Sequence, residues 1–485
     1  MPIVVGDLKF FASERMIDNL SAVPGVGGGG YMSQTQVVDG TQNNVFPDVM
    51  PGDRVAGVVQ LRQVYPSVLS ADNAAMSNAA AGVTVRPTDA NVEIVAFTAP
   101  GNSSAAAAAA VGSKWTGGGE TTNGNITTSN GSIVGLYLGE PLPAVGDLVR
   151  VRVVPPPGFF AGTPIDLGMR LVTAVAGGAG GTVTFDGDPY PYFTSDHAAA
   201  IHVVASAGAG TRVSAVSLLT ADAAAAATTV TVDKLWAAVQ LPGATTIDTA
   251  GEPSARRGQL PLYLPGDVLL IENGATREAA VVATVNYLTG VITLAAGLAN
   301  AFASGSKVTR PVHLGTLQAA ANNVLAQQTW TRTWSDALIG TSIASRYSGA
   351  LPVTNGGATT DRWACVFTSA TAYNLLSERL GQIGAGSTAT DYAPLNPATN
   401  QPYFTLRAAG WGAGWLPGNV LRFNTQAAAA PIWLQRLVTP GAAGGTDKAY
   451  TAEDVPTLTE ALQRIFSGIQ EESSTFITPS ISVNT

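Results

Sequence analysis

The stretch Pro265-Gly-Asp-Val-Leu269 places a tight turn directly before a run of apolar residues, and related forms occur at two other points of the chain. These are Pro51-Gly-Asp-Arg-Val55 and Val145-Gly-Asp-Leu-Val149. Glycine and aspartate favour the turn, and the β-branched residues behind it favour pairing in a sheet. Alternating runs such as Val92-Glu-Ile-Val-Ala-Phe97 are typical of half-buried strands. We therefore predict that the first two thirds of the chain are β.

The second and third of these turns are followed by similar sequences. Residues 170–176 and 181–185 match residues 280–285 and 291–294, and Phe193-Thr-Ser195 before His202 matches Phe302-Ala-Ser304 before His313. This pattern predicts two related β-domains, residues 129–206 and 207–316, that arose by internal duplication. Chance similarity between strands rich in Gly, Val and Thr is the alternative.

The composition changes after His313. Residues 318–328 contain strong helix formers, and the stretch 372–383 places leucines and an isoleucine at helical spacing. A further amphipathic stretch follows Pro456, with one apolar face formed by Leu458, Leu462, Ile465, Phe466 and Ile469. The predicted fold is therefore mainly β and multi-domain, with an arm and β region at 1–128 and an α+β C-terminal domain at 317–485.

Charge and composition argue against several classes of protein. Of the 485 residues only 12% are charged, and 25 Lys and Arg against 33 Asp and Glu give a net charge of −8. No global positive field is present, so we expect no binding to nucleic acid. The N-terminus lacks the pattern of a signal peptide, and the alanine tracts are too short to span a bilayer. We expect synthesis in the cytoplasm and no membrane insertion.

Few residues suggest chemistry. With one cysteine (Cys365) and three histidines, neither a disulfide framework nor a Cys/His zinc site is available within one chain. Cys365 lies in an apolar run, which indicates a buried structural thiol. Gly340-Thr-Ser-Ile-Ala344 loosely resembles a nucleophile elbow, but the last glycine and a following histidine are missing. We predict no catalytic residue, no metal and no cofactor, and hence no enzyme.

Three other features have competing interpretations. Residues 25–30 are glycine-rich, but no Gly-Lys-Ser/Thr follows, so a mobile loop is favoured over a phosphate site. The carboxylates around residues 186–196 suit solvated turns better than a calcium loop, whose spacing they do not match. The remaining feature is a set of tryptophans, for which core or subunit packing is favoured over stacking on sugars or bases. These are Trp330, Trp334, Trp411, Trp415 and Trp433.

The overall composition points to a role. Small residues, low charge and many turns are typical of secreted or surface proteins, yet neither an export signal nor a disulfide set is present. Virion proteins combine these properties, because they assemble in the bacterial cytoplasm and bury weakly charged faces against copies of themselves.

Two longer blocks then resemble a known family. Residues 10–19, 37–48 and 52–62 are similar to the N-terminal signature of a virion structural protein of tailed phages and prophages, including Mu-like ones. The segments 416–425 and 430–441 are similar to the C-terminal part of that family. The resemblance implies a structural component of the phage particle and brings no catalytic residue with it. We place it at the tail tip or baseplate, with the head–tail connection as the alternative.

This resemblance leads to a hypothesis of assembly. We expect a symmetric ring or trimer in the phage tail, with copies of itself and other tail proteins as partners. Residues 1–62 would clamp a neighbour by strand addition or loop docking. The candidate interface residues are Phe10, Phe11, Arg15, Asn43, Asn44, Phe46, Pro47 and Arg54. Adhesion to the host surface or a glycan through the β-domains is the second hypothesis, and a cell-wall hydrolase, which no motif supports, is the third.

Overall fold

The computed structural model describes residues 3–21, 26–41, 43–112, 133–135, 145, 148–154, 165–176, 182–185, 198–205, 212–240, 257–286, 289–317, 320–322 and 344–439. Antiparallel strands are the main regular structure in these residues and far outnumber helices, so the prediction of a mainly β fold is confirmed. The helices of this part of the chain are short: η1 (Val5–Asp7), α1 (Pro51–Ala56), α2 (Ser104–Gly112), η3 (Ala344–Arg346) and η4 (Ala408–Gly410).

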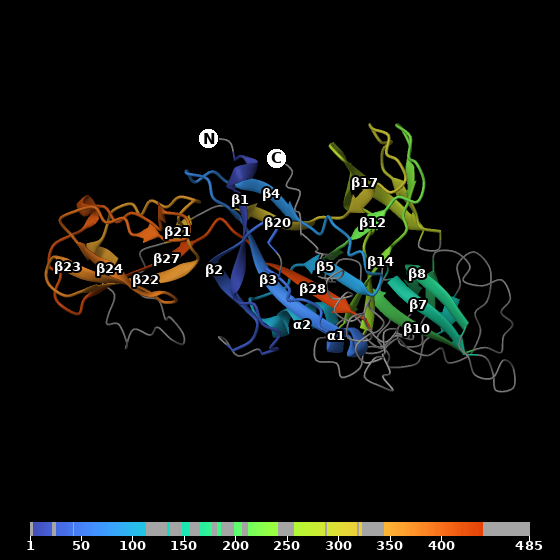
Figure 1. Ribbon diagram of the computed structural model, residues 1–485, viewed down its shortest axis with the longest axis horizontal. Helices are drawn as coiled ribbons and strands as arrows, with labels where there is room; N and C mark the ends of the chain where they lie inside the picture. The colour runs from blue at the N-terminus through green and yellow to red at the C-terminus, as the bar shows by residue number, and fades with distance from the viewer. Residues whose placement is uncertain are drawn as a thin grey trace, which may run out of the picture.

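One six-stranded sheet, here called the central sheet, lies in the middle of the molecule (Figure 1). Its strands, in spatial order, are β11 (Val213–Ser214), β5 (Val92–Phe97), β28 (Ile432–Val438), β3 (Val58–Val68), β1 (Leu8–Arg15) and β2 (Gly29–Val37). β28 is the last described strand of the chain, yet it lies between β3 and β5. The N-terminal and C-terminal parts of the chain therefore build one sheet together.

Two further sheets share one topology. The first repeat sheet consists of β10 (Ala198–Ala205), β7 (Leu148–Val154), β8 (Ile165–Ala176), β9 (Thr182–Phe185) and β6 (Ile133–Gly135), in that spatial order. The second has the same order in β19 (Lys307–Thr309), β16 (Val268–Asn273), β17 (Thr276–Asn286), β18 (Val291–Leu294) and β13 (Thr229–Thr231). It also has one added edge strand, β12 (Val216–Leu218), beside β19.

The registers of the two repeat sheets agree in part, although β7 and β8 have a register shift between Arg150 and Arg152 that β16 and β17 lack. Leu148 pairs with Leu171 in the first, and Val268 pairs with Val281 in the second. Each sheet also carries a register shift at the same place, directly after the pairs Val172 with Phe185 and Val282 with Leu294. A shared bulge position is what duplication would produce, and duplication of the two β-domains stays a prediction.

One part of the predicted match is wrong. His202 pairs with Arg150, and the equivalent pair in the second repeat sheet is Thr309 with Leu270. Thr309, not His313, is therefore the counterpart of His202. His313 belongs to a separate two-stranded ribbon formed by β20 (Val312–Leu317) and β4 (Met76–Ala81). Histidine spacing misled the comparison because the segment before it differs in length between the two copies.

Of the three predicted turns before strands, that at residues 265–267 is present, that at residues 51–55 is not, and Gly146 and Asp147 of the third lie outside the described residues. At Pro265-Gly-Asp267 the backbone N–H of Leu264 donates to the Asp267 carboxylate over 2.7 Å, and Gly266 has φ +88°. A positive φ at the third turn position favours glycine. Residues 51–55, predicted as a turn and strand, instead form α1, and β3 begins only at Val58. Proline at the first helical position and an aspartate in the first turn favour this helix.

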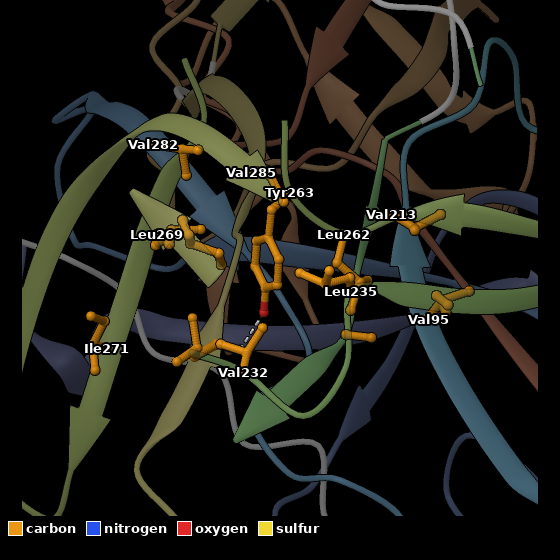
Figure 2. Packing of buried hydrophobic residues seen from close by; sticks show 14 of the residues in the cluster. Val95, Val213, Val232, Leu235, Leu262, Tyr263, Leu269, Ile271, Val282 and Val285 are labelled. Carbon is orange, nitrogen blue, oxygen red and sulfur yellow. Dashed lines mark hydrogen bonds between the residues drawn. The ribbon is translucent and has the colours of Figure 1, made fainter. Parts of the chain in front are cut away.

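The second repeat sheet packs against the central sheet in one hydrophobic core. Figure 2 shows Val95 and Val213 of the central sheet together with Leu269 of the second repeat sheet, and Tyr263 lies between them. The Tyr263 hydroxyl lies 2.7 Å from Ser217 Oγ and 2.9 Å from the Val308 carbonyl oxygen. Burial raises the pKa of Tyr263, so its hydroxyl keeps its proton and remains a donor.

The predicted C-terminal domain differs from expectation in its described part. Residues 320–322 and 344–426, here called the aromatic module, form a sheet around an aromatic core at one end of the molecule (Figure 1). Its strands, in spatial order, are β21 (Ala320–Asn322), β27 (Val420–Gln426), β22 (Asp361–Phe367), β23 (Ala372–Ser377) and β24 (Gly381–Ser387). Phe367 and Trp415 stack with ring centroids 4.1 Å apart.

The helix predicted over residues 372–383 is wrong, because this stretch is the hairpin of β23 and β24. Tyr373, Leu375 and Ser377 are buried while the residues between them are half-buried, which is the period of a strand. The backbone N–H groups of Arg379 and Leu380 both donate to Ser377 Oγ and fix the turn. The helical spacing of the leucines was a coincidence of this alternation.

Of the other two predicted helices, the structure describes residues 320–322 of one and no residue of the other. Of the stretch 318–328, the described residues 320–322 form β21, a strand rather than a helix. The stretch after Pro456 lies outside the described residues. Two further small ribbons complete the described fold: β14 (Trp236–Gln240) with β15 (Arg257–Pro261), and β25 (Leu395–Asn396) with β26 (Gln401–Pro402).

The core around Tyr263 provides a stability prediction. Tyr263→Ala should lower the free energy of unfolding by about 3–5 kcal/mol, because a fully buried ring is removed. Tyr263→Phe should cost only about 1 kcal/mol through the lost hydrogen bond. Urea unfolding followed by near-ultraviolet circular dichroism measures both. Tyr31→Phe, at an exposed tyrosine, is the control, and equal effects of all three variants would contradict this account.

Candidate assembly interface

The eight residues predicted to form an interface fall into two groups. Phe10, Phe11 and Arg15 lie on β1, inside the central sheet. The other five lie between β2 and β3, in a connection that we call the arm loop, residues 38–57. Those five are Asn43, Asn44, Phe46, Pro47 and Arg54.

The residues on β1 contact the protein itself. Phe11 is only 3% exposed and packs with Met32 and Tyr65, and Phe10 is half-buried against a neighbouring part of the core. Arg15 Nε donates to the carbonyl oxygen of Gly27. In this structure Phe11 is thus not accessible to a partner, and this group holds the arm in place.

The glycine-rich segment beside Arg15 is not the mobile loop that its composition suggested, at least over the described residues 27–30. All four glycines are buried. The Gly28 N–H donates to the Asn19 carbonyl oxygen over 2.9 Å, and the Gly28 carbonyl accepts from Ser104 N–H over 3.0 Å. A Cβ on Gly29 would lie 2.7 Å from the Trp433 ring. Glycine is needed here for close approach of the backbone, so composition alone misidentified the reason for it.

The second group is organised around Phe46. The guanidinium carbon of Arg62, on β3, lies 5.9 Å from the centroid of the Phe46 ring, and that of Arg436, on β28, lies 4.9 Å from it. Both distances are within the range of cation–π attraction. The arm loop is therefore attached to the central sheet by one arginine from each end of the chain.

The two arginines have polar partners of their own. Arg62 forms an ion pair with Asp18, with Nη2 to Oδ2 at 2.9 Å. Arg436 Nε donates to Gln60 Oε1 over 2.8 Å. Because both arginines are less than 10% exposed, these partners offset the cost of burying two like charges.

Burial and the neighbouring charges shift the pKa of Arg436. Desolvation, reinforced by the nearby charge of Arg62, lowers the pKa of Arg436 to about 10. The carboxylates of Asp18, Asp53 and Asp48 act in the opposite direction. Arg436 therefore remains protonated at neutral pH, and the Phe46 contact persists throughout the physiological range.

Polar side chains of the arm loop donate hydrogen bonds to its own backbone, whereas several of its apolar side chains are exposed to solvent. Asn44 Nδ2 donates to the Val38 carbonyl oxygen over 2.7 Å, and Arg54 Nε donates to that of Val49 over 3.2 Å. Val38 is 51% exposed and Met50 60% exposed, and Asn43 and Pro47 are exposed as well. A held loop that presents apolar side chains to solvent is suited to docking against another protein.

Sites for chemistry are sparse in the part of the chain that the structure describes. Within it, no cluster of three His, Cys, Asp or Glu side chains is placed to hold a metal ion. Cys365 is fully buried, as predicted, and burial raises its pKa well above the ordinary value, which disfavours the thiolate. Ser342 and the carboxylates at 186–196 lie outside the described residues. Trp415 and Trp433 pack in cores, whereas Trp330 and Trp334 also lie outside.

The described residues contain no helix that could span a membrane, and they include a shallow apolar depression. Over the residues with a described structure, no helix has the length and apolar character needed to cross a bilayer. A small apolar depression of about 20 Å³ lies between β1 and the ribbon of β4 and β20, with Phe10, Met76 and Leu317 in its wall. Lys9 is the charged residue of that wall, and no acid–base pair accompanies it.

Comparison with known proteins identifies no relative. Neither the protein-family models nor the curated proteins give a match to this sequence. A search of solved structures gives the crystal structure of a tetra-tandem repeat in the extending region of a large adhesion protein, at a TM-score of 0.11 and 10% identity. The alignment covers 77% of this chain and 100% of that one. A TM-score this low carries no argument about fold or function.

The Phe46 contact generates a prediction about the arm loop. Phe46→Leu removes the aromatic face but keeps apolar bulk, and Phe46→Ala removes both. Because cation–π contacts that are partly desolvated contribute about 1–2 kcal/mol, amide exchange in residues 43–54 should accelerate roughly 5–30-fold in Phe46→Leu and further in Phe46→Ala.

Phe46→Trp is the matched control, since it retains an aromatic face over the two arginines. Exchange in this variant should stay near that of the unsubstituted chain. Equal exchange rates in the Leu, Ala and Trp variants would contradict a loop held by arginine–aromatic contacts.

Proposed function

We propose that this chain is a non-enzymatic structural component of a tailed bacteriophage particle, a symmetric oligomer at the tail tip or baseplate. One observation carries the proposal. The two sequence blocks that resemble the phage family, residues 1–62 and 416–441, lie far apart in the chain, but part of each supplies neighbouring strands of the central sheet, β3 and β28. Residues 420–425 of the second block belong instead to β27 of the aromatic module. The resemblance is informative because β3 and β28, one from each block, form one structural unit.

The same unit carries the arm loop. Arg62 belongs to the first block and Arg436 to the second, and both guanidinium groups lie within cation–π range of the Phe46 ring. One arginine from each block thus holds the same surface loop in a fixed position. Preorganised loops lower the entropy that is lost on association, which favours a role in assembly.

The exposed tips supply the contact itself. Val38, Pro47 and Met50 are exposed, whereas the side chains behind them are held by the protein. Apolar and methionine side chains are enriched in the cores of protein interfaces, and the low overall charge limits repulsion between copies. A protein at the neck of the particle would bind its neighbours through the same kind of apolar contact. Microscopy of labelled particles is therefore needed to distinguish the neck from the tail tip.

A negative charge introduced at the loop tip tests the proposal. Met50→Asp places a carboxylate in the proposed contact, and we expect at least a tenfold loss of the chain from purified particles, measured by quantitative immunoblotting. The substituted side chain is exposed, so the fold should be unaffected. Leu395→Asp, at a leucine of similar exposure on the aromatic module, is the matched control.

Immunogold microscopy of the same particles gives the location. Label at the distal tail is the expected result, and label at the neck would replace the tail-tip placement with the connector. Unchanged incorporation of the Met50→Asp chain would overturn the interface, and absence of the unsubstituted chain from particles would overturn the virion assignment.

A further inference from the structure

The methionines of this chain differ widely in their access to solvent. The structure describes the side chains of four of the six methionines. Met50, in the arm loop, is 60% exposed, whereas Met32 and Met76 are 5% and 8% exposed. Met16 is half-buried, and its sulfur accepts a hydrogen bond from Ser13 Oγ over 3.4 Å. Among the described methionines, Met50 is therefore the one whose sulfur is open to reagents in water.

The two buried methionines are covered by packed hydrophobic cores. Met32 belongs to the cluster that also contains Phe11 and Tyr65. Met76 belongs to a separate cluster, together with Val68. A reagent can reach either sulfur only when the surrounding core opens, and such openings of a packed core are rare. The fold therefore protects these two thioethers and leaves the one in the arm loop unprotected.

The backbone at Met50 is fixed although its side chain is exposed. The Met50 N–H donates to Asp53 Oδ2 over 3.2 Å, and the Met50 carbonyl oxygen accepts from the Arg54 N–H over 3.1 Å. Met50 thus occupies the N-cap position of α1. Arg54 Nε in turn donates to the Val49 carbonyl oxygen over 3.2 Å. The thioether is therefore presented to solvent at a fixed point of the arm loop.

An exposed thioether reacts with hydrogen peroxide to give a sulfoxide. The sulfur attacks one oxygen of the peroxide, so that an S–O bond forms as the O–O bond breaks. The second oxygen leaves and takes up the proton of the first, which gives water. The sulfur loses two electrons and the peroxide gains them. Because the product is polar whereas the thioether is apolar, the reaction removes the apolar character of the side chain.

We propose that Met50 is a site of selective oxidation by hydrogen peroxide, and that its sulfoxide on the free chain prevents docking of the arm loop. The first part stands on exposure alone, and the second rests on the docking role proposed above. A sulfoxide placed in an apolar contact leaves its oxygen without a hydrogen-bond donor, which weakens the contact. Once the loop is docked, the partner covers Met50 and excludes the peroxide.

The first measurement is made on the free, full-length chain. After brief treatment with dilute hydrogen peroxide, tandem mass spectrometry of proteolytic peptides gives the sulfoxide fraction at each methionine. Met50 should oxidise about tenfold faster than Met32 and Met76, because the last two react only after their cores open. In urea above the unfolding transition the three rates should converge. Equal rates in the folded chain, or a difference that persists in urea, would overturn the site.

A matched pair of substitutions tests the consequence for docking. Met50→Gln places a polar, uncharged side chain of similar length at the tip, as the sulfoxide does. It should lower the amount of this chain in purified particles about tenfold, because a polar group is left without a partner in the contact. Met50→Leu keeps the apolar bulk without the sulfur and should be incorporated like the unsubstituted chain. Equal incorporation of the two variants would overturn the effect of oxidation on docking.

Assembled particles provide an independent readout of protection. When purified particles are treated with the same peroxide, Met50 should oxidise about tenfold more slowly than in the free chain, because the contact excludes water. Oxidation of Met50 at the same rate in particles and in the free chain would overturn protection by docking.

Failure of the proposed function gives a different pattern of results. If the Met50→Asp chain is incorporated normally, or if the unsubstituted chain is absent from particles, the docking role falls, and the order of oxidation on the free chain is unaffected. If the docking role holds but Met50 is not oxidised first, only the oxidation site falls.

Discussion

The insertion of β28 between β3 and β5 is the constraint on which the remaining structure depends. All seven residues of β28 are buried, and its backbone pairs on both sides over nearly its whole length. The central sheet is complete only when a strand from near the end of the described chain reaches its middle. The repeat sheets and the aromatic module are excursions from this sheet, so their positions are set by where the chain leaves it and returns. Pairing between segments so far apart in the chain has a high entropic cost. We therefore expect the pairing of β28 to be a slow step in folding.

This constraint also connects the fold with the proposed role. Because β28 lies beside β3, the guanidinium groups of Arg436 and Arg62 both lie within cation–π range of the Phe46 ring. The arm loop is therefore a product of both ends of the chain. At the neighbouring edge, the aromatic module returns to cover β2 through Arg379. One sheet thus contacts both the arm loop, at Phe46, and the aromatic module, at Arg379.

The sequence predicts the β class and the turn before the strand at residues 265–269, since these follow from local turn chemistry and alternation, but the same signal at residues 51–55 belongs to a helix. It does not predict strand order, because pairing across hundreds of residues leaves no local signal. The helix predicted at 372–383 failed for a related reason: over a short stretch, leucines in a hairpin can mimic helical spacing. The candidate interface stays a prediction: the structure shows Phe46 against Arg62 and Arg436 in the arm loop, and Phe11 buried in the central sheet. Arg62 and Arg436 lay within the quoted blocks but were not singled out, because only their contacts in the folded chain reveal their role.

Native-state hydrogen exchange on β28 tests the central claim most directly. If β28 completes the central sheet, the amides of β28, β3 and β5 should exchange in one cooperative opening, with the slowest rates in the described chain and a common response to denaturant. A β28 that exchanges much faster than β3 and β5, with its own weak denaturant dependence, would show a sheet that is stable without it. That result would contradict an architecture built on the pairing of the two ends of the chain.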